Sequence, residues 1–198
     1  MIVPPLVLAS ASPRRRGLLS AVGMSIARVT PADIDESVRE GEAPIAYAAR
    51  LAREKADAVW SEGAVVLAAD TVVHFDGRVF GKPVDDADAC AILRQLSGRW
   101  HAVTTGYCVL GPDRTAVDHG TVTARVRFRV LTEPMLRAYV QTGEGRDKAG
   151  AYGVQGLGAA LVAEVAGSAS TVVGLPMEPV LAALAHVGIE PGSAEEVS

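Results

Sequence analysis

Residues that could bind an anion gather in one short stretch near the N-terminus. An apolar run of strand type, Leu6–Ala9, leads into a small polar turn with Ser10 and Ser12, and Pro13 then suits the first position of a helix. A helix N-terminus after such a turn aims free N–H groups at one point, and the arginines at 14–16 add guanidinium groups that suit phosphate. The stretch predicts a phosphate site, with arginines on a solvated helix face as the alternative.

A lysine and an aspartate form a second set of reactive groups. Lys55 lies on the apolar face of a predicted helix that runs from Pro44 to about Trp60, so its ammonium must reach an edge or meet an anion. Asp70 follows the apolar run 64–69, a buried-strand pattern that we expect to end there. Because chemistry in open α/β sheets gathers beyond the strand ends, Asp70 is either a turn residue or a metal ligand or general base.

Two further segments carry charge that could serve the same chemistry. The connector 31–42 is acidic and includes Glu36, although a solvated loop is its simpler interpretation, and a Gly-Lys-Pro triplet places Lys82 soon after Asp70. Carboxylates can hold a divalent cation against phosphate oxygens, and one of them can take a proton from water. Lysine and arginine offset the charge of the phosphoryl group. The combination predicts phosphoanhydride hydrolysis on a nucleotide or a similar substrate.

The bulk composition limits the class of protein. The chain has 198 residues, 49% of them hydrophobic, and a net charge of -4, which supports one large or two small packed domains and excludes a globally basic nucleic-acid binder. Its two cysteines form no framework, and we expect a reduced, cytoplasmic setting with no signal peptide and no membrane span. The four histidines lack zinc spacing, and no serine-hydrolase elbow, Walker loop or dinucleotide fingerprint occurs.

Hydrophobic periodicity predicts an α/β protein in which strands and helices alternate. We expect strands at 6–9, 27–30, 64–69, 72–75, 78–80, 100–110, 122–130 and 159–165. We expect helices at 13–19, 44–60, 87–96 and 132–142, and a last helix that opens at Pro176. Ile45 should face inward on its helix and Val130 on its strand. The segment Gly143–Gly158 is rich in glycine and is either a plain surface loop or a functional one.

Several motifs in one order resemble the Maf family of nucleoside triphosphate pyrophosphatases. They are LASASPRR at 8–15, IDE at 34–36, RLAREKA at 50–56, ADTVV at 69–73, GKP at 81–83, LSGRWHAV at 96–103, DKAGAYGVQG at 147–156 and VVGLP at 172–176. The resemblance covers nearly the whole chain. It implies a single domain over 1–198, with two lobes of mixed sheet and flanking helices around one central cleft, and a loose tail at 190–198. It also implies a homodimer without nucleic-acid or membrane partners.

The resemblance also implies roles for individual residues. Asp70 matches the family's proton acceptor, and Glu36 and Asp70 match positions that hold a divalent cation, Mg²⁺ or Mn²⁺. Positions that contact the substrate are matched by Ser10, Arg15, Lys55 and Lys82. Positions that distinguish the subfamilies are matched by Arg14, Thr71 and Gln155. These three residues follow the dTTP/UTP branch, whereas Ala169 departs from the family because relatives often carry an aromatic residue there.

The resemblance implies an enzyme that cleaves dTTP and UTP between the α- and β-phosphates, giving the monophosphate and pyrophosphate. One alternative is a nucleotide-binding regulator of cell division with little turnover, which the intact Asp70 opposes because a pure binder would gain by losing a carboxylate that repels phosphates. The other alternative is a 7-methyl-GTP pyrophosphatase, which Thr71 and Gln155 oppose.

Overall fold

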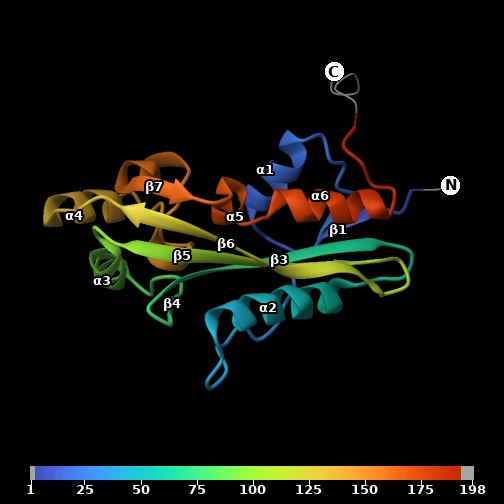
Figure 1. Ribbon diagram of the computed structural model, residues 1–198, viewed down its shortest axis with the longest axis horizontal. Helices are drawn as coiled ribbons and strands as arrows, with labels where there is room; N and C mark the ends of the chain where they lie inside the picture. The colour runs from blue at the N-terminus through green and yellow to red at the C-terminus, as the bar shows by residue number, and fades with distance from the viewer. Residues whose placement is uncertain (1–2, 193–198) are drawn as a thin grey trace. The chain divides into compact units, whose positions relative to one another are not determined.

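A computed structural model describes residues 3–192, and its helices alternate with the strands of one mixed sheet, as predicted (Figure 1). The seven strands are β1 (Leu6–Leu8), β2 (Arg28–Val29), β3 (Val65–Phe75), β4 (Arg78–Phe80), β5 (Trp100–Leu110), β6 (Ala116–Phe128) and β7 (Val162–Ala166). The α-helices are α1 (Pro13–Ala21), α2 (Pro44–Val59), α3 (Asp86–Leu96), α4 (Glu133–Gln141), α5 (Ala169–Val173) and α6 (Met177–His186). Two 3₁₀ helices are η1 (Ala149–Ala151) and η2 (Gly156–Leu161).

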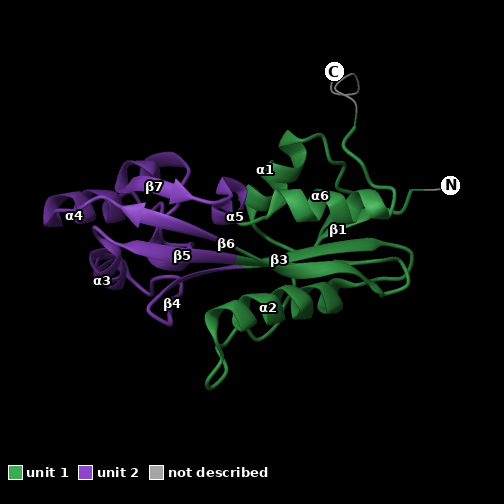
Figure 2. Cartoon of the chain, in the orientation of Figure 1, with its two compact units in different colours: residues 1–70, 105–122, 174–198 green, residues 71–104, 123–173 purple. Residues whose placement is uncertain are grey.

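The strands follow the order β2-β1-β3-β5-β6-β7, and β4 pairs with β3 as a hairpin. The chain divides into two compact units (Figure 2). Unit 1 comprises Met1–Asp70, Thr105–Val122 and Gly174–Ser198, and unit 2 comprises Thr71–Thr104 and Thr123–Val173. The predicted arrangement of two lobes around one cleft stays a prediction. In the predicted tail 190–198, residues 193–198 lie outside the described part.

In unit 1, helices cover both faces of the parallel strands around β1. β1 pairs in parallel with β2 and with β3, where Val7 lies opposite Val66. Helices α1 and α6 cover one face of these strands, and α2 covers the other (Figure 1). Leu67 and Ala69 face the first layer, and Val66 and Ala68 face α2. This double coverage explains the continuous apolar run of β3, because a strand buried on both faces shows no polar alternation.

Helix α2 approaches the sheet closely at one glycine. A Cβ atom built on Gly106 of β5 would lie 2.3 Å from the carbonyl oxygen of Ala48. The next residues of β5 on this face, Cys108 and Leu110, are fully buried against the helix. Gly106 therefore sets the distance between α2 and β5, and with it the height at which α2 holds its side chains over the sheet.

Unit 2 has one apolar core, to which α3, α4 and the glycine-rich segment contribute. An aromatic group lies within it: the rings of His101, Phe128 and Tyr152 meet edge to face, and the His101 Nε2 lies 2.8 Å from the Tyr152 hydroxyl oxygen. Burial lowers the pKa of His101 to about 4, so the ring is neutral at pH 7. Arg94 of α3 donates two hydrogen bonds to the carboxylate of Glu133 on α4.

Local sequence signals located most of the element boundaries correctly. Ser12, Asp85 and Thr132 cap α1, α3 and α4, and each side chain accepts a hydrogen bond from a backbone N–H in the first turn. The turn Asp76-Gly77 has positive φ at both residues, which matches a type I′ hairpin. Among residues 3–192, no helix has both the length and the apolar character needed to cross a membrane.

The prediction that the third strand ends at Asp70 was wrong, because β3 continues to Phe75. Asp70 lies inside this strand and is buried rather than placed in a turn. A carboxylate interrupts an apolar pattern without interrupting backbone pairing, and the residues after Asp70 return to β-branched types. The site therefore sits on a continuous strand.

Other boundaries and burial assignments differ as well. The predicted strand 159–165 begins only at Val162, since 156–161 form η2, and the segment 167–174 contains the short helix α5. Strand β6 starts at Ala116 and ends at Phe128, so Val130 lies beyond it and is exposed. Ile45 is also exposed, because the first turn of α2 extends past the surface that the helix covers.

We predict that Gly106→Ala lowers the free energy of unfolding by about 1–3 kcal/mol, because the added methyl group forces α2 and β5 apart. Urea unfolding of the wild type and the variant measures the change. Gly17→Ala is the control, since a Cβ there has no atom within 4 Å, and the better helix propensity of alanine should raise stability by up to about 1 kcal/mol. Equal effects at the two glycines would contradict the close approach.

Candidate active site

A buried lysine joins two carboxylates in unit 1. The Nζ of Lys55 on α2 lies 2.5 Å from Oδ1 of Asp70 on β3 and 2.8 Å from Oε1 of Glu36 in the acidic connector. The side chains of Lys55 and Asp70 are nearly buried, whereas about half of the Glu36 side chain is exposed. Of the two outcomes predicted for Lys55, an ammonium that reaches an edge or one that meets an anion, the structure shows the second.

The alternation of β3 brings Asp70 to this lysine. Val66 and Ala68 face α2, and because side chains alternate along a strand, Asp70 points to the same face. Lys55 lies in the buried stripe of α2 with Leu51, Ala52 and Ala56. An ammonium buried beside apolar groups needs a charged partner, and Asp70 is the carboxylate that the strand places opposite it.

Ser10 and Arg15 form a second cluster where β1 meets α1. The Ser10 hydroxyl oxygen accepts hydrogen bonds from Ser12 N and from Arg15 Nη1, at 3.1 and 3.0 Å. Arg15 Nε donates to the carbonyl oxygen of Gly174, at 2.8 Å. These contacts hold the guanidinium beside the N-terminus of α1, whose dipole favours an anion.

The two clusters share one electrostatic environment. Burial lowers the pKa of Arg15, while the negative charge of Asp70 and, more weakly, that of Glu36 act to raise it. Burial raises the pKa of Tyr47, and the same two carboxylates raise it further. Unit 1 therefore combines two cationic side chains, two carboxylates and a helix N-terminus, a set that can bind a phosphate chain and activate water beside it.

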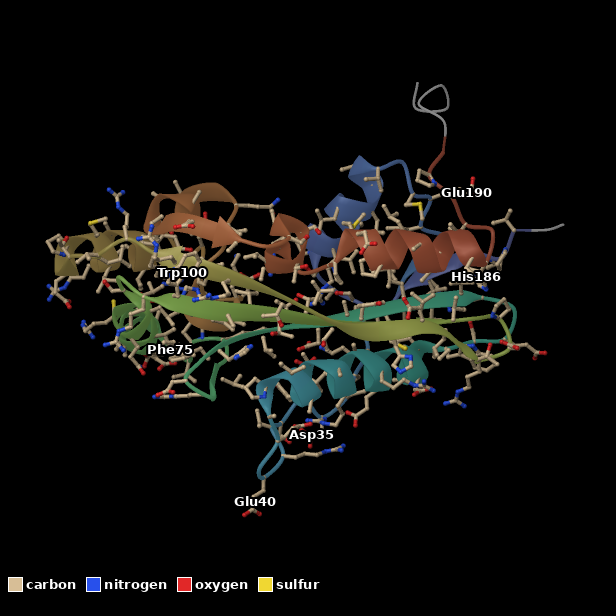
Figure 3. The ribbon with its side chains drawn as sticks, in the orientation of Figure 1. Asp35, Glu40, Phe75, Trp100, His186 and Glu190 are labelled. Carbon is tan, nitrogen blue, oxygen red and sulfur yellow. The ribbon has the colours of Figure 1, made fainter. Side chains whose placement is uncertain are left out.

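The connector that carries Glu36 has no regular structure, and α2 holds it in place. The hydroxyl of Tyr47 donates to the carbonyl oxygen of Glu36 at 2.7 Å, and Arg50 donates to the carbonyl oxygen of Ser37 at 3.0 Å. Figure 3 shows Asp35 beside α2 and Glu40 at the tip of the connector. The segment near Glu36 is thus tied to the helix that carries Lys55.

Arg50 also anchors the start of α2, a role that the sequence analysis missed. Its guanidinium forms two hydrogen bonds with the Glu42 carboxylate, at 2.6 and 2.7 Å, and a third with Glu54. The bonds from Arg50 lower the pKa of Glu42 to about 2. The i,i+4 spacing of a helix accounts only for the Arg50–Glu54 pair, because Glu42 precedes the helix and its partner depends on the path of the connector.

The predicted site residues are divided between the two units of the chain. Unit 1 contains Ser10, Arg14, Arg15, Glu36, Lys55 and Asp70. Unit 2 contains Thr71, Lys82 and Gln155. Lys82 and Gln155 are exposed, and Thr71 is half-buried in β3. Arg14 lies in the first turn of α1 and is half-buried.

Two carboxylates of unit 1 carry oxygen atoms of the kind that bind a divalent cation. One oxygen atom of Asp70 and one of Glu36 lie within hydrogen-bonding distance of Lys55 Nζ, so the two carboxylates lie close to each other. Mg²⁺ is usually bound by one or two carboxylates together with substrate phosphates and water. Within the described residues, 3–192, no three His, Cys, Asp or Glu side chains form a group that could hold a metal by themselves.

Comparison with known proteins places the chain beside one family. Residues 5–187 match the family model described as "Maf-like protein". The chain is 51% identical to a "dTTP/UTP pyrophosphatase" of Anaeromyxobacter dehalogenans, covering 94% of this chain and 96% of the relative. It is 46% identical to a protein of the same name from Aquifex aeolicus, covering 86% and 89% of the two chains.

Solved structures show a weaker likeness. A HAM1 protein from Coxiella burnetii is 18% identical, with a TM-score of 0.42 over 63% of this chain and 73% of that one. A dITP/XTP pyrophosphatase from Mycobacterium abscessus is 20% identical, with a TM-score of 0.38 over 63% and 72%. We draw no conclusion from a likeness at this level.

We predict that Lys55→Met lowers the free energy of unfolding by roughly 3 kcal/mol, because the buried Asp70 loses its charged partner. Adding Asp70→Asn should restore part of the loss, which a double-mutant cycle of urea unfolding measures. Arg53→Met on the same helix removes the partly exposed pair with Asp57 and should cost less than about 1 kcal/mol. Equal losses for Lys55→Met and Arg53→Met would contradict this account.

Proposed function

Because the chain belongs to the family of Maf-like proteins, we propose that it hydrolyses dTTP and UTP between the α- and β-phosphates to the monophosphate and pyrophosphate. The observation that carries the proposal is the contact of Lys55 with Asp70 and Glu36, close to the charge of Arg15. The relatives with the same activity in their names support the substrates. They do not favour a regulator with little turnover or a 7-methyl-GTP pyrophosphatase.

In this proposal the residues of unit 1 divide the work. Ser10, Arg15 and the first turn of α1 bind phosphate oxygens, since they supply a hydroxyl, a guanidinium and backbone N–H groups. Lys55 holds the Asp70 carboxylate in one place and offsets negative charge on the phosphoryl group. Asp70 accepts a proton from the attacking water.

We further propose a divalent cation, Mg²⁺ or Mn²⁺, held by Glu36 and Asp70 together with the substrate. When bound, it would neutralise charge on the phosphate oxygens and help pyrophosphate to leave. The contacts from Tyr47 and Arg50 to the connector support this role for Glu36, because they hold its backbone close to Lys55.

The family resemblance supports the remaining assignments. Lys82 contacts the substrate, and Arg14, Thr71 and Gln155 distinguish one base from another. We also propose that the protein acts as a cytoplasmic homodimer and binds neither nucleic acid nor membranes.

The test is to incubate the purified protein with each nucleoside triphosphate, including 7-methyl-GTP, with Mg²⁺ or Mn²⁺ and to measure pyrophosphate. We expect pyrophosphate from dTTP and UTP, and none after a chelator removes the cation. Nucleotide binding without any pyrophosphate would identify a regulator, and preference for 7-methyl-GTP would identify the other branch.

We predict that Asp70→Asn folds and lowers kcat by about 100-fold or more, because an amide cannot accept the proton of the attacking water. Steady-state pyrophosphate release from dTTP measures the loss, and urea unfolding verifies the fold. Asp113→Asn, in an exposed turn of the same unit, is the control and should leave kcat unchanged. Turnover near the wild-type rate in Asp70→Asn would overturn the assignment of the general base.

We predict that Gln155→Glu lowers kcat/KM for dTTP and UTP by about tenfold, because a carboxylate cannot donate a hydrogen bond to the base and repels the phosphates. Rates with all nucleoside triphosphates show whether the ranking of substrates changes. Gln141→Glu, at the exposed end of α4, is the matched control. An unchanged ranking would mean that Gln155 does not read the base.

A further inference from the structure

Gln155 lies in a segment that its composition alone would leave mobile. The segment Gly143–Gly158, which we call the glycine-rich loop, contains six glycines. The Gln155 side chain is exposed and makes no capping bond to η2. A side chain that distinguishes bases must be held in one orientation, so the backbone on either side of Gln155 needs an anchor.

Glu144 provides this anchor on the C-terminal side of Gln155. Its Oε2 accepts a hydrogen bond from Leu157 N at 2.7 Å, and its Oε1 accepts one from Gly158 N at 2.8 Å. Burial by itself raises the pKa of Glu144. These two hydrogen bonds, together with a third from the hydroxyl group of Tyr139, outweigh burial and lower the pKa. The carboxylate is therefore charged at neutral pH and makes charge-assisted bonds, which are stronger than neutral ones.

Tyr139 of α4 extends the anchor to the other side of Gln155. Its hydroxyl donates to Glu144 Oε1 at 3.0 Å and accepts from Gly153 N at 3.3 Å. The side chains of Tyr139 and Glu144, which are hydrogen-bonded to each other, thus accept hydrogen bonds from backbone N–H groups on both sides of Gln155. The donors are Gly153, Leu157 and Gly158. Tyr139 is a buried residue of α4, so the pair ties the loop to that helix.

Two glycines allow the loop to close around this carboxylate. A Cβ atom on Gly156 would lie 2.6 Å from Glu144 Oε2, and one on Gly158 would lie 2.0 Å from the carbonyl oxygen of Gly153. Gly156 also has φ of +71°, where a side chain is strained. Gly156 and Gly158 therefore permit the tight closure of the loop around Glu144 and Gly153.

We propose that Glu144 is a positioning residue for substrate choice: by holding the backbone on both sides of Gln155, directly and through Tyr139, it fixes the orientation in which Gln155 meets the base. The inference rests on the proposed function and deepens it. In this proposal Glu144 acts through Gln155 and does not itself contact the substrate.

The first experiment measures the anchor without any substrate. Hydrogen exchange of the backbone amides in Glu144→Gln should be about tenfold faster at Leu157 or Gly158, because a side-chain amide has one acceptor oxygen in place of two. Glu164→Gln, an exposed carboxylate of the same unit paired with Arg127, should leave these amides unchanged. Unchanged exchange in Glu144→Gln would overturn the anchor.

The second experiment measures substrate choice in the full-length enzyme. The ratio of kcat/KM for dTTP to kcat/KM for GTP should fall about tenfold in Glu144→Gln. The fall should come from a change in KM, and kcat should stay within about threefold of the wild-type value. In a Gln155→Ala background the same substitution should change the ratio by less than about twofold, because Glu144 acts through Gln155. An equal fall in both backgrounds would overturn the proposal, as would a ratio that Glu144→Gln leaves unchanged.

Tyr139→Phe keeps the test decisive if Glu144→Gln does not fold. This variant removes one donor to Glu144 and the acceptor for Gly153 N, and it should shift the ratio in the same direction by a smaller factor. If the wild type releases pyrophosphate from no nucleotide, the proposed function fails. Substrate choice is then measured as the ratio of the dissociation constants of dTTP and GTP. Glu144→Gln is again compared in the wild-type and Gln155→Ala backgrounds, with the same expected outcomes.

Discussion

The buried ammonium of Lys55 is the constraint on which the site depends. It lies in the apolar stripe of α2, where an unpaired charge would be costly, and Asp70 and Glu36 both converge on it. The lysine thereby ties a helix, a central strand and an irregular connector together. The same arrangement concentrates charge of both signs next to the N-terminus of α1, as the proposed hydrolysis of a phosphate chain requires.

Close backbone approach sets the positions of these elements. Gly106 lets α2 lie near the sheet, and the face of β3 that carries Val66 and Ala68 then presents Asp70 at the depth of Lys55. A carboxylate within a continuous strand is held more rigidly than one in a turn, because backbone pairing continues past it. The strand therefore provides the orientation that Asp70 needs as the proposed general base, without a dedicated loop.

The irregular segments that carry the proposed site residues Glu36 and Gln155 are held in the same way. In unit 1, Tyr47 and Arg50 of α2 bind backbone carbonyl groups of the acidic connector. In unit 2, Glu144 and Tyr139 bind backbone N–H groups of the glycine-rich loop. Each segment lacks regular backbone pairing, so side chains anchored near a helix satisfy its polar groups and limit its motion. Glu36 and Gln155 are each presented from a backbone fixed in this way.

The sequence by itself determined the local features: the helix caps at Ser12 and Thr132, the strands on either side of the Asp76-Gly77 turn, the apolar stripe of α2 and the place of Lys55 on that stripe. Motif order also determined the family. Only the tertiary structure decided which anion Lys55 meets, that β3 continues through Asp70, and that Arg15 bonds to the carbonyl of Gly174. Caps and periodicity are set by neighbours in the chain, whereas these contacts join distant segments, and their partners follow from packing that no local pattern encodes.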